Sequence, residues 1–320
     1  MKTMTYFGLF LSVAFTAFTM AQNSPAGTEI QPPGFTGAVS GNGAWPAVAQ
    51  SRADLRTHTL YRPVSLPESP MPVLLWGNGG CSDNGLGHSY FLREVASHGY
   101  LVVALGYAAS ERPLEGDRPP APPALRNNTA PPPGPGQDAT HVEQHYYAMD
   151  WLAKRNADPV DELYGRVNLA QIAVAGHSCG GLQAIKTAAD PRIATAMIFD
   201  SGIYNRGSRG ISAIEVAKEE LNSLHGPVAY ITGGPEDIAH ANSVDDVSRI
   251  HHVPVFFGWM PVGHGGTFWK EDDGGQWGEV AVHWLDWQFR GSHEAQRWFN
   301  GTDCVLCSAP GWTVERRADQ

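Results

Sequence analysis

The chain has 320 residues and a formal net charge of −10, with 42% hydrophobic and 17% charged residues. This composition is typical of a globular protein, and the length suits one large domain or two small ones. The acidic balance argues against nucleic acid or an anionic membrane surface as the main partner.

The first residues of the chain are typical of an export signal. A basic start at Lys2 precedes the largely apolar run Tyr6–Met20, and Ala21 completes a cleavage site of small residues. The apolar run is short for a membrane span, and polar residues follow it. We therefore expect residues 1–21 to be a signal peptide. The rest should be a secreted monomer, extracellular or periplasmic, without stable membrane insertion.

Strand and helix patterns alternate along the remainder of the chain. Residues 22–53 are rich in glycine, proline and small residues and are expected to be irregular. Short apolar or alternating runs predict strands at residues 57–63, 71–76, 100–105, 171–175, 194–199, 228–232 and 253–259. Helical spacing predicts helices at residues 91–98, 141–155, 179–189 and 279–289. This alternation predicts the α/β class, with a doubly wound, mostly parallel sheet flanked by helices.

Two segments do not follow this alternation. Residues 109–137 are crowded with prolines, which is typical of a linker or of a long loop. Because the alternation continues on both sides, we interpret them as an insert in a single domain, residues 22–320. The insert could be a lid or plain surface. Residues 291–320 are expected to form a C-terminal tail.

The stretch Gly176-His177-Ser178-Cys179-Gly180 joins a predicted strand to a predicted helix and matches the pattern G-x-S-x-G. In this context a serine sits in a sharp turn with its hydroxyl exposed, and small neighbours let the strand and helix pack closely. Free N–H groups at the start of the helix favour developing negative charge. The pattern therefore predicts that Ser178 is a nucleophile.

A nucleophilic serine needs a base and an acid. His264 follows the last predicted strand in a glycine-rich loop, "VGHGG", and is our candidate base. Asp237 follows the strand at 228–232 and gives the chain order Ser, Asp, His that is typical of this turn. Asp200, at the end of the strand before it, is the competing candidate for the acid.

Hydrolysis by a serine also needs N–H donors for an oxyanion. The residue after the nucleophile, Cys179, should supply one backbone N–H. The second should come from the glycine-rich loop after the strand at 71–76, where Gly79 is our candidate and Gly80 is the alternative.

The four cysteines favour two disulfides in an exported protein. Cys304 and Cys307 are close in sequence, so a local bridge is the simplest interpretation. That pairs Cys81 with Cys179 and would join the two predicted oxyanion elements, provided that their Cα atoms lie within about 7 Å. Two separate buried thiols are the alternative.

Several stretches resemble the α/β-hydrolase family, in the branch that contains dienelactone hydrolases, cutinase-like polyester hydrolases and related secreted carboxylesterases. The resemblance covers residues 61–289 and depends on these stretches: "WGNGGC", "FLREVASHGYLVVALGY", "AGHSCGG", "GGPEDIAHAN" and "VGHGGT". It implies triad roles for Ser178, Asp237 and His264, and a place for His177 beside the acyl site. A cysteine after the serine departs from the cutinase-like pattern.

The expected activity is hydrolysis of a small-molecule or polymeric ester through an acyl-enzyme, without a metal or organic cofactor. Four aromatic residues next to the motif loops could line a pocket or belong to the core: Trp76, Trp259, Phe268 and Trp269. A peptidase or acyltransferase on the same triad is an alternative, and so is a catalytically silent binding module. A metal-binding module built on His240, His251, His252 and the last two cysteines is a more distant one.

Overall fold

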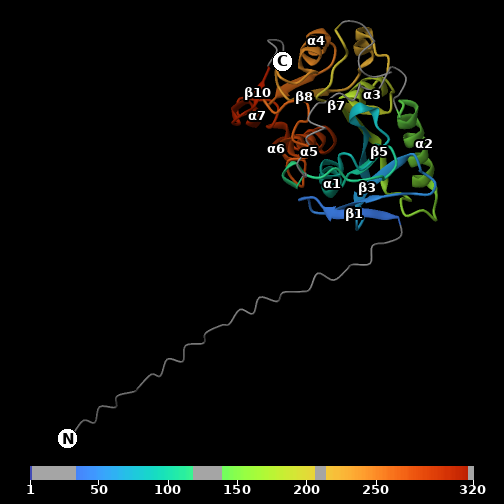
Figure 1. Cartoon of the computed structure of the whole chain (residues 1–320). Helices are drawn as coiled ribbons and strands as arrows, with labels where there is room; N and C mark the ends of the chain where they lie inside the picture. Colours follow the sequence, from blue (N-terminus) through green and yellow to red (C-terminus); the bar gives the residue numbers. More distant parts are fainter. Residues whose placement is uncertain (2–33, 118–138, 206–213, 316–320) are drawn as a thin grey trace. The chain divides into compact units, whose positions relative to one another are not determined.

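One sheet organises the computed structural model of the chain (Figure 1). The structure describes residue 1 and residues 34–117, 139–205 and 214–315, and the elements below lie in the compact unit Gly34–Gln320. Within these residues the sheet has ten strands: β1 (Phe35–Ser40), β2 (Ala47–Gln50), β3 (His58–Pro63), β4 (Met71–Gly77), β5 (Leu101–Leu105), β6 (Val167–His177), β7 (Ile193–Phe199), β8 (Val228–Thr232), β9 (Val255–Trp259) and β10 (Thr313–Val314).

The strand order is β1-β2-β3-β5-β4-β6-β7-β8-β9-β10. The strands from β5 to β9 in this order are parallel, whereas β1, β2, β3 and β10 pair antiparallel at the two sides. The helices described are α1 (Ser89–Ser97), α2 (Glu143–Ala157), α3 (Cys179–Thr187), α4 (His240–Arg249), α5 (Gly275–Arg290), α6 (His293–Gln296) and α7 (Val305–Ser308). Short 3₁₀ helices cover Gly79–Cys81, Glu115–Asp117 and Lys218–Ser223.

Helices cover both faces of the sheet, and two apolar cores result. Successive side chains of a strand point to opposite faces, so Val73 and Leu75 of β4 enter one core, and Leu74 and Trp76 enter the other. Helices α2, α3 and α4 close the first core, and α1 and α5 close the second (Figure 1). Strands buried on both faces read as continuous apolar runs, which is why β4 and β5 could be predicted from sequence.

The parallel strands end together at one edge of the sheet. Gly77 of β4 lies opposite Gly176 of β6, His177 lies opposite Phe199 of β7, and Thr232 of β8 lies opposite Trp259 of β9. Loops that leave this carboxyl edge are therefore neighbours, although they come from distant parts of the chain. Ligand sites of open α/β sheets are usually found at such an edge.

The predicted α/β class and mostly parallel sheet with flanking helices are confirmed. The expectation that residues 22–53 are irregular is wrong for their later part, because β1 and β2 extend the sheet there. The run that forms β2, "AVAQ", is too short to give a clear alternating pattern. The helices α4, α6 and α7 and the strand β10 were also not predicted, since all but α4 are four residues or shorter.

Some expectations concern residues outside the described ranges. The predicted signal peptide lies there apart from Met1, and so does most of the proline-rich insert. Within the part of the chain that the structure describes, no helix combines the length and the hydropathy needed to cross a membrane.

Candidate functional site

The turn from β6 to α3 holds Ser178 in a conformation that few residues adopt. Ser178 has φ 54° and ψ −119° and is one of three non-glycine residues with positive φ among those described. Such a backbone costs on the order of 1–3 kcal/mol and persists only where its surroundings enforce it. The side chains around the turn are small for a steric reason. A Cβ on Gly176 would lie 2.2 Å from the carbonyl oxygen of Gly180, and one on Gly180 would lie 2.0 Å from that of Gly77.

Three predicted residues form one line of hydrogen bonds at the carboxyl edge. The Oγ of Ser178 lies 2.9 Å from Nε2 of His264, and Nδ1 of His264 lies 2.6 Å from Oδ1 of Asp237. A carboxylate can only accept, so Nδ1 of His264 carries the proton and donates it to Asp237. The remaining nitrogen, Nε2, then accepts from the hydroxyl of Ser178. The arrangement can therefore take a proton from the serine.

The surroundings of Asp237 keep its carboxyl ionised. Burial acts to raise the pKa of Asp237, but three hydrogen bonds outweigh it and lower the pKa below its usual value. They come from His264 and from the backbone N–H groups of Ala239 and Gly233, at 2.9 and 3.1 Å for the latter two. A charged acid at this position favours the proton on His264 facing it and stabilises a cationic imidazole.

Asp200, the competing candidate, has a different environment. It is fully buried with φ 44°, and its Oδ2 accepts from the indole N–H of Trp277 at 3.0 Å. Burial, together with the nearby carboxylate of Asp237, raises the pKa of Asp200 well above its usual range. The structure thus brings Asp237 to the imidazole of His264, and it brings Asp200 to the indole of Trp277.

A disulfide joins the two loops that were expected to hold an oxyanion. Cys81 and Cys179 are bonded, with Cα atoms 5.2 Å apart, and a second disulfide joins Cys304 to Cys307. The first bond fastens the 3₁₀ helix Gly79–Cys81 to the start of α3. The N–H of Cys179 is among the first four of that helix, which have no acceptor within it. Gly79 lies beside the turn, since a Cβ there would be 2.5 Å from Nδ1 of His177.

A pocket of about 230 Å³ opens beside Ser178 and His264. The half-buried imidazole of His264 forms part of its wall, as does Asp200. Other residues of the wall come from α3, from the loops after β7 and β8 and from the start of α4. They include Leu182, Ser201, Gly202, Tyr204, Ile238 and Asn242. Sequence reasoning named none of these residues as site residues, although Ile238 and Asn242 stand in the stretch "GGPEDIAHAN". The position of Ile238 next to Asp237 was the available signal.

The aromatic residues are divided between core and site surroundings. Trp76 is fully buried, and its N–H donates to Oδ1 of Asn78 at 3.0 Å. It packs against Phe91 and Phe268 in the core under the site, so the structure does not bring it to the pocket wall. Trp259 lies against His240 and is likewise not part of that wall.

His177, expected beside the acyl site, is almost completely buried behind it. Its imidazole contacts the ring of His264, with centroids 5.2 Å apart, and the ring of Phe268 at the same distance. Trp269 lies 5.8 Å from it. The structure therefore places His177 next to the proposed base rather than on the surface of the pocket.

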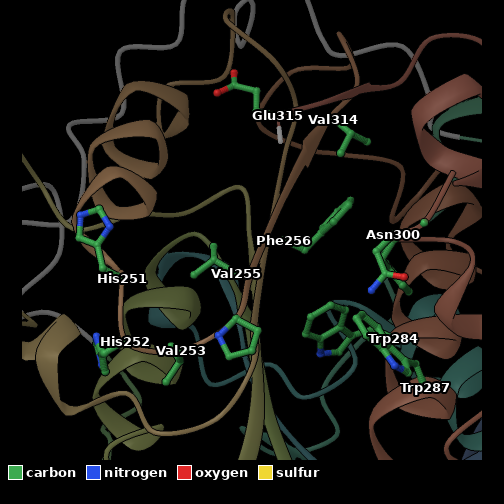
Figure 2. Close-up of a pocket in the computed structure, with 13 residues that line it drawn as sticks. His251, His252, Val253, Val255, Phe256, Trp284, Trp287, Asn300, Val314 and Glu315 are labelled. Atoms are coloured by element: carbon green, nitrogen blue, oxygen red, sulfur yellow. The ribbon is translucent and has the colours of Figure 1, made fainter. Parts of the chain in front are cut away.

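A larger cavity of about 700 Å³ lies away from these residues, at the start of β9 (Figure 2). Val253 and Val255 line it on one side, and Phe256, Trp284 and Trp287 line it on the other (Figure 2). Because β9 begins here and ends near the site, this cavity is at the opposite edge of the sheet. It contains neither the serine nor the base.

The metal-binding alternative loses its sulfur ligands in this structure. Cys304 and Cys307 form a disulfide, so neither is available as a thiolate. His252 forms a hydrogen bond with the backbone oxygen of Leu224, and His240 forms one with the hydroxyl of Thr232. In the described ranges, no three His, Cys, Asp or Glu residues come together in a way that could hold an ion.

Comparison with known proteins gives a partial relative. The chain matches no protein-family model. Hydrolase ffsE from Aspergillus flavipes is 28% identical to it over 167 residues, which are 48% of this chain and 31% of the relative. The chain thus corresponds to about a third of the length of this curated relative.

Proposed function

We propose that the protein is a secreted serine hydrolase of the α/β-hydrolase family that cleaves carboxylic esters through an acyl-enzyme. The observation that carries this proposal is the line of hydrogen bonds from Ser178 through His264 to Asp237, at 2.9 and 2.6 Å. Three residue types that fit nucleophile, base and acid come from three separate loops and meet at one edge of the sheet. The partial relative is named a hydrolase, which supports the reaction class.

In the first half of the reaction, Ser178 attacks the ester carbonyl while Nε2 of His264 takes the serine proton. The tetrahedral intermediate then collapses as His264 delivers that proton to the departing alcohol. The acyl group stays on Ser178, and the carboxylate of Asp237 stabilises the transient imidazolium. In the second half, His264 takes a proton from water, which attacks the acyl-enzyme and releases the acid.

Negative charge develops on the carbonyl oxygen in both halves. In this proposal the backbone N–H of Cys179, at the start of α3, donates to this oxygen. A second donor comes from the neighbouring glycine loop, from Gly79 or Gly80. Preorganised donors of this kind typically contribute 10²–10³ in kcat each. The Cys81–Cys179 disulfide holds the two donor segments together, which keeps the distance between them fixed.

The first experiment compares hydrolysis of p-nitrophenyl esters, from acetate to long acyl chains, by the mature protein and by S178A. We expect S178A to fall to background, since it lacks the nucleophile. Ser248, an exposed serine of α4, provides the matched control S248A, which should keep full activity. A fluorophosphonate should label the wild type and S248A, and it should not label S178A. The acyl-length profile would then define the substrate class.

Two results would refute the proposal. Equal activity in the wild type and S178A would mean that another group performs the chemistry. A folded wild type that neither turns over any ester nor reacts with the fluorophosphonate would favour the silent binding module. Turnover of peptides in preference to esters would instead indicate a peptidase on the same three residues.

A further inference from the structure

We infer that two buried histidines, His177 and His88, are positioning residues. They fix the loop of His264, the proposed base, relative to the glycine-rich loop that contains Gly79. This inference rests on the proposed function, because it concerns how His264 is kept in place. Neither histidine is part of the line of hydrogen bonds from the serine to the acid. Both lie directly behind it, and His88 had no role in any sequence motif.

The contact of His177 with the base loop fixes which of its nitrogens carries the proton. Its Nε2 lies 2.8 Å from the backbone carbonyl oxygen of His264. A carbonyl oxygen only accepts, so Nε2 of His177 must be the protonated nitrogen and must donate. The bond holds the main chain of the very residue whose side chain is the proposed base.

The same reasoning then fixes the state of His88. Because Nε2 of His177 is protonated, Nδ1 of its neutral ring can only accept. The nitrogen that faces it, at 3.3 Å, is Nε2 of His88, which must therefore be the donor. The other nitrogen, Nδ1 of His88, is buried without a hydrogen-bond partner among the described residues. His88 thus donates one hydrogen bond, and that bond goes to His177.

The surroundings of the pair keep both rings uncharged. Burial and the neighbouring His264 lower the pKa of His177 to about 4, and burial also lowers the pKa of His88 well below its usual value. Arg112 disfavours a cation on either ring, and Asp237 acts in the opposite direction on His177. Asp200 lies 4.0 Å from Nε2 of His177, and burial raises the pKa of its carboxyl well above the usual value, which disfavours an anion at this position.

The position of His177 connects three segments of the site. It immediately precedes Ser178, its Nε2 holds the loop of His264, and its Nδ1 is the atom that a Cβ on Gly79 would meet at 2.5 Å. Rotation or displacement of this ring would therefore move the base relative to the serine and to the oxyanion donors. The hydrogen bond from His88 opposes that movement. The imidazole of His88 is itself surrounded by three aromatic rings, with centroids 4.9–5.1 Å from its own: Trp76, Phe268 and Trp269.

The test uses His88, which is not part of the pocket wall, in a matched pair of variants. H88L keeps an apolar side chain among the aromatic rings but cannot donate a hydrogen bond. H88Q keeps an N–H donor of similar reach. We expect H88L to lower kcat for a p-nitrophenyl ester roughly ten- to a hundredfold, the range that a small misplacement of reacting groups produces. KM should change less than about twofold, and H88Q should recover most of kcat.

Imidazole NMR of the ¹⁵N-labelled protein gives a second readout that does not need turnover. With signals assigned through H177Q, we expect His177 and His88 to be neutral and protonated on Nε2 near neutral pH. The Nδ1 proton of His264, bonded to Asp237, should shift in H88L and return toward its original position in H88Q.

The outcomes separate this inference from the proposed function. A His177 protonated on Nδ1 would overturn the positioning role, whether or not the protein cleaves esters. Equal loss of kcat in H88L and H88Q, or no loss in H88L, would overturn it for an active enzyme. If the wild type cleaves no ester, the proposed function fails, and the NMR result decides alone whether the two rings hold the His264 loop.

Discussion

The disulfide between Cys81 and Cys179 should contribute to both stability and activity, and the chain contains its own control. The double variant C81A/C179A removes the bond that joins the glycine loop to the start of α3. The matched variant C304A/C307A removes the second disulfide, which lies in the C-terminal tail. Each variant removes two sulfur atoms and leaves no free thiol.

The two bonds differ in the length of chain that they close. The partners are 98 residues apart in the first and 3 apart in the second. In the chain-entropy treatment, loops of these lengths correspond to about 4.7 and about 1.6 kcal/mol. C81A/C179A should therefore lower the free energy of unfolding by about 3 kcal/mol more than C304A/C307A. Complete burial of Cys81, against exposure of Cys307, acts in the same direction.

Urea unfolding followed by tryptophan fluorescence measures this difference, and the same samples can be assayed on a p-nitrophenyl ester. We expect kcat of C81A/C179A to fall tenfold or more, toward the 10²–10³ that loss of an oxyanion donor costs. C304A/C307A should keep wild-type kcat. Equal destabilisation of the two variants would refute the loop argument, and full activity of C81A/C179A would refute the role of the bond in holding the donors.

Three further predictions follow from the contacts around the site. D237N should lower kcat by about four orders of magnitude, because an amide no longer fixes the proton on His264. D200N should lose less than about tenfold, because Asp200 does not contact the imidazole of His264 and its raised pKa disfavours the anion that an amide would replace; similar losses would mean that the acid is shared. G180A forces a Cβ to 2.0 Å from a backbone oxygen and should cost at least about 1–3 kcal/mol in urea unfolding, while G116A, whose Cβ would meet nothing within 4 Å, should cost far less. Acid should destabilise the fold through buried histidines whose pKa values burial lowers from 6.5 to about 4, about 3 and about 4: His58, His145 and His177. Each histidine provides stability that is fully present above pH 6.5 and is lost toward its folded pKa, at about 1.4 kcal/mol per pH unit. Asp246 opposes this loss because burial raises its pKa to about 6, so the four groups together should lower the free energy of unfolding by about 3 kcal/mol per unit between pH 6 and pH 4. A midpoint of urea unfolding that does not change over this range would contradict the prediction.

Two kinds of feature could be predicted from the sequence: strands with a continuous apolar run, and residues that follow the end of such a strand. The apolar runs of β4, β5, β7 and β8 have the burial that their composition indicated. The residues Ser178, Asp237 and His264 each follow a parallel strand, so the register of the sheet brings their loops together. Short elements such as β2 and β10 give no periodic signal. The pocket wall could not be predicted either, because Tyr204 reaches it from the loop after β7 and Asn242 from the start of α4, and neither position carries a periodic signal.

The choice between Asp237 and Asp200 shows where sequence reasoning reaches its limit. Both acids follow neighbouring parallel strands, and both precede the histidine in the chain, so order alone does not separate them. The two acids differ in how many residues separate each from the end of its strand. Asp200 comes immediately after Phe199 of β7, where a positive φ turns its side chain inward to Trp277. Asp237 comes five residues after Thr232 of β8, and this longer loop carries its carboxylate across to Nδ1 of His264. The N–H groups of Gly233 and Ala239 also donate to this carboxylate and help to lower its pKa, whereas burial and the neighbouring Asp237 raise the pKa of Asp200. The longer loop after β8 therefore brings Asp237, and not Asp200, to the imidazole of His264.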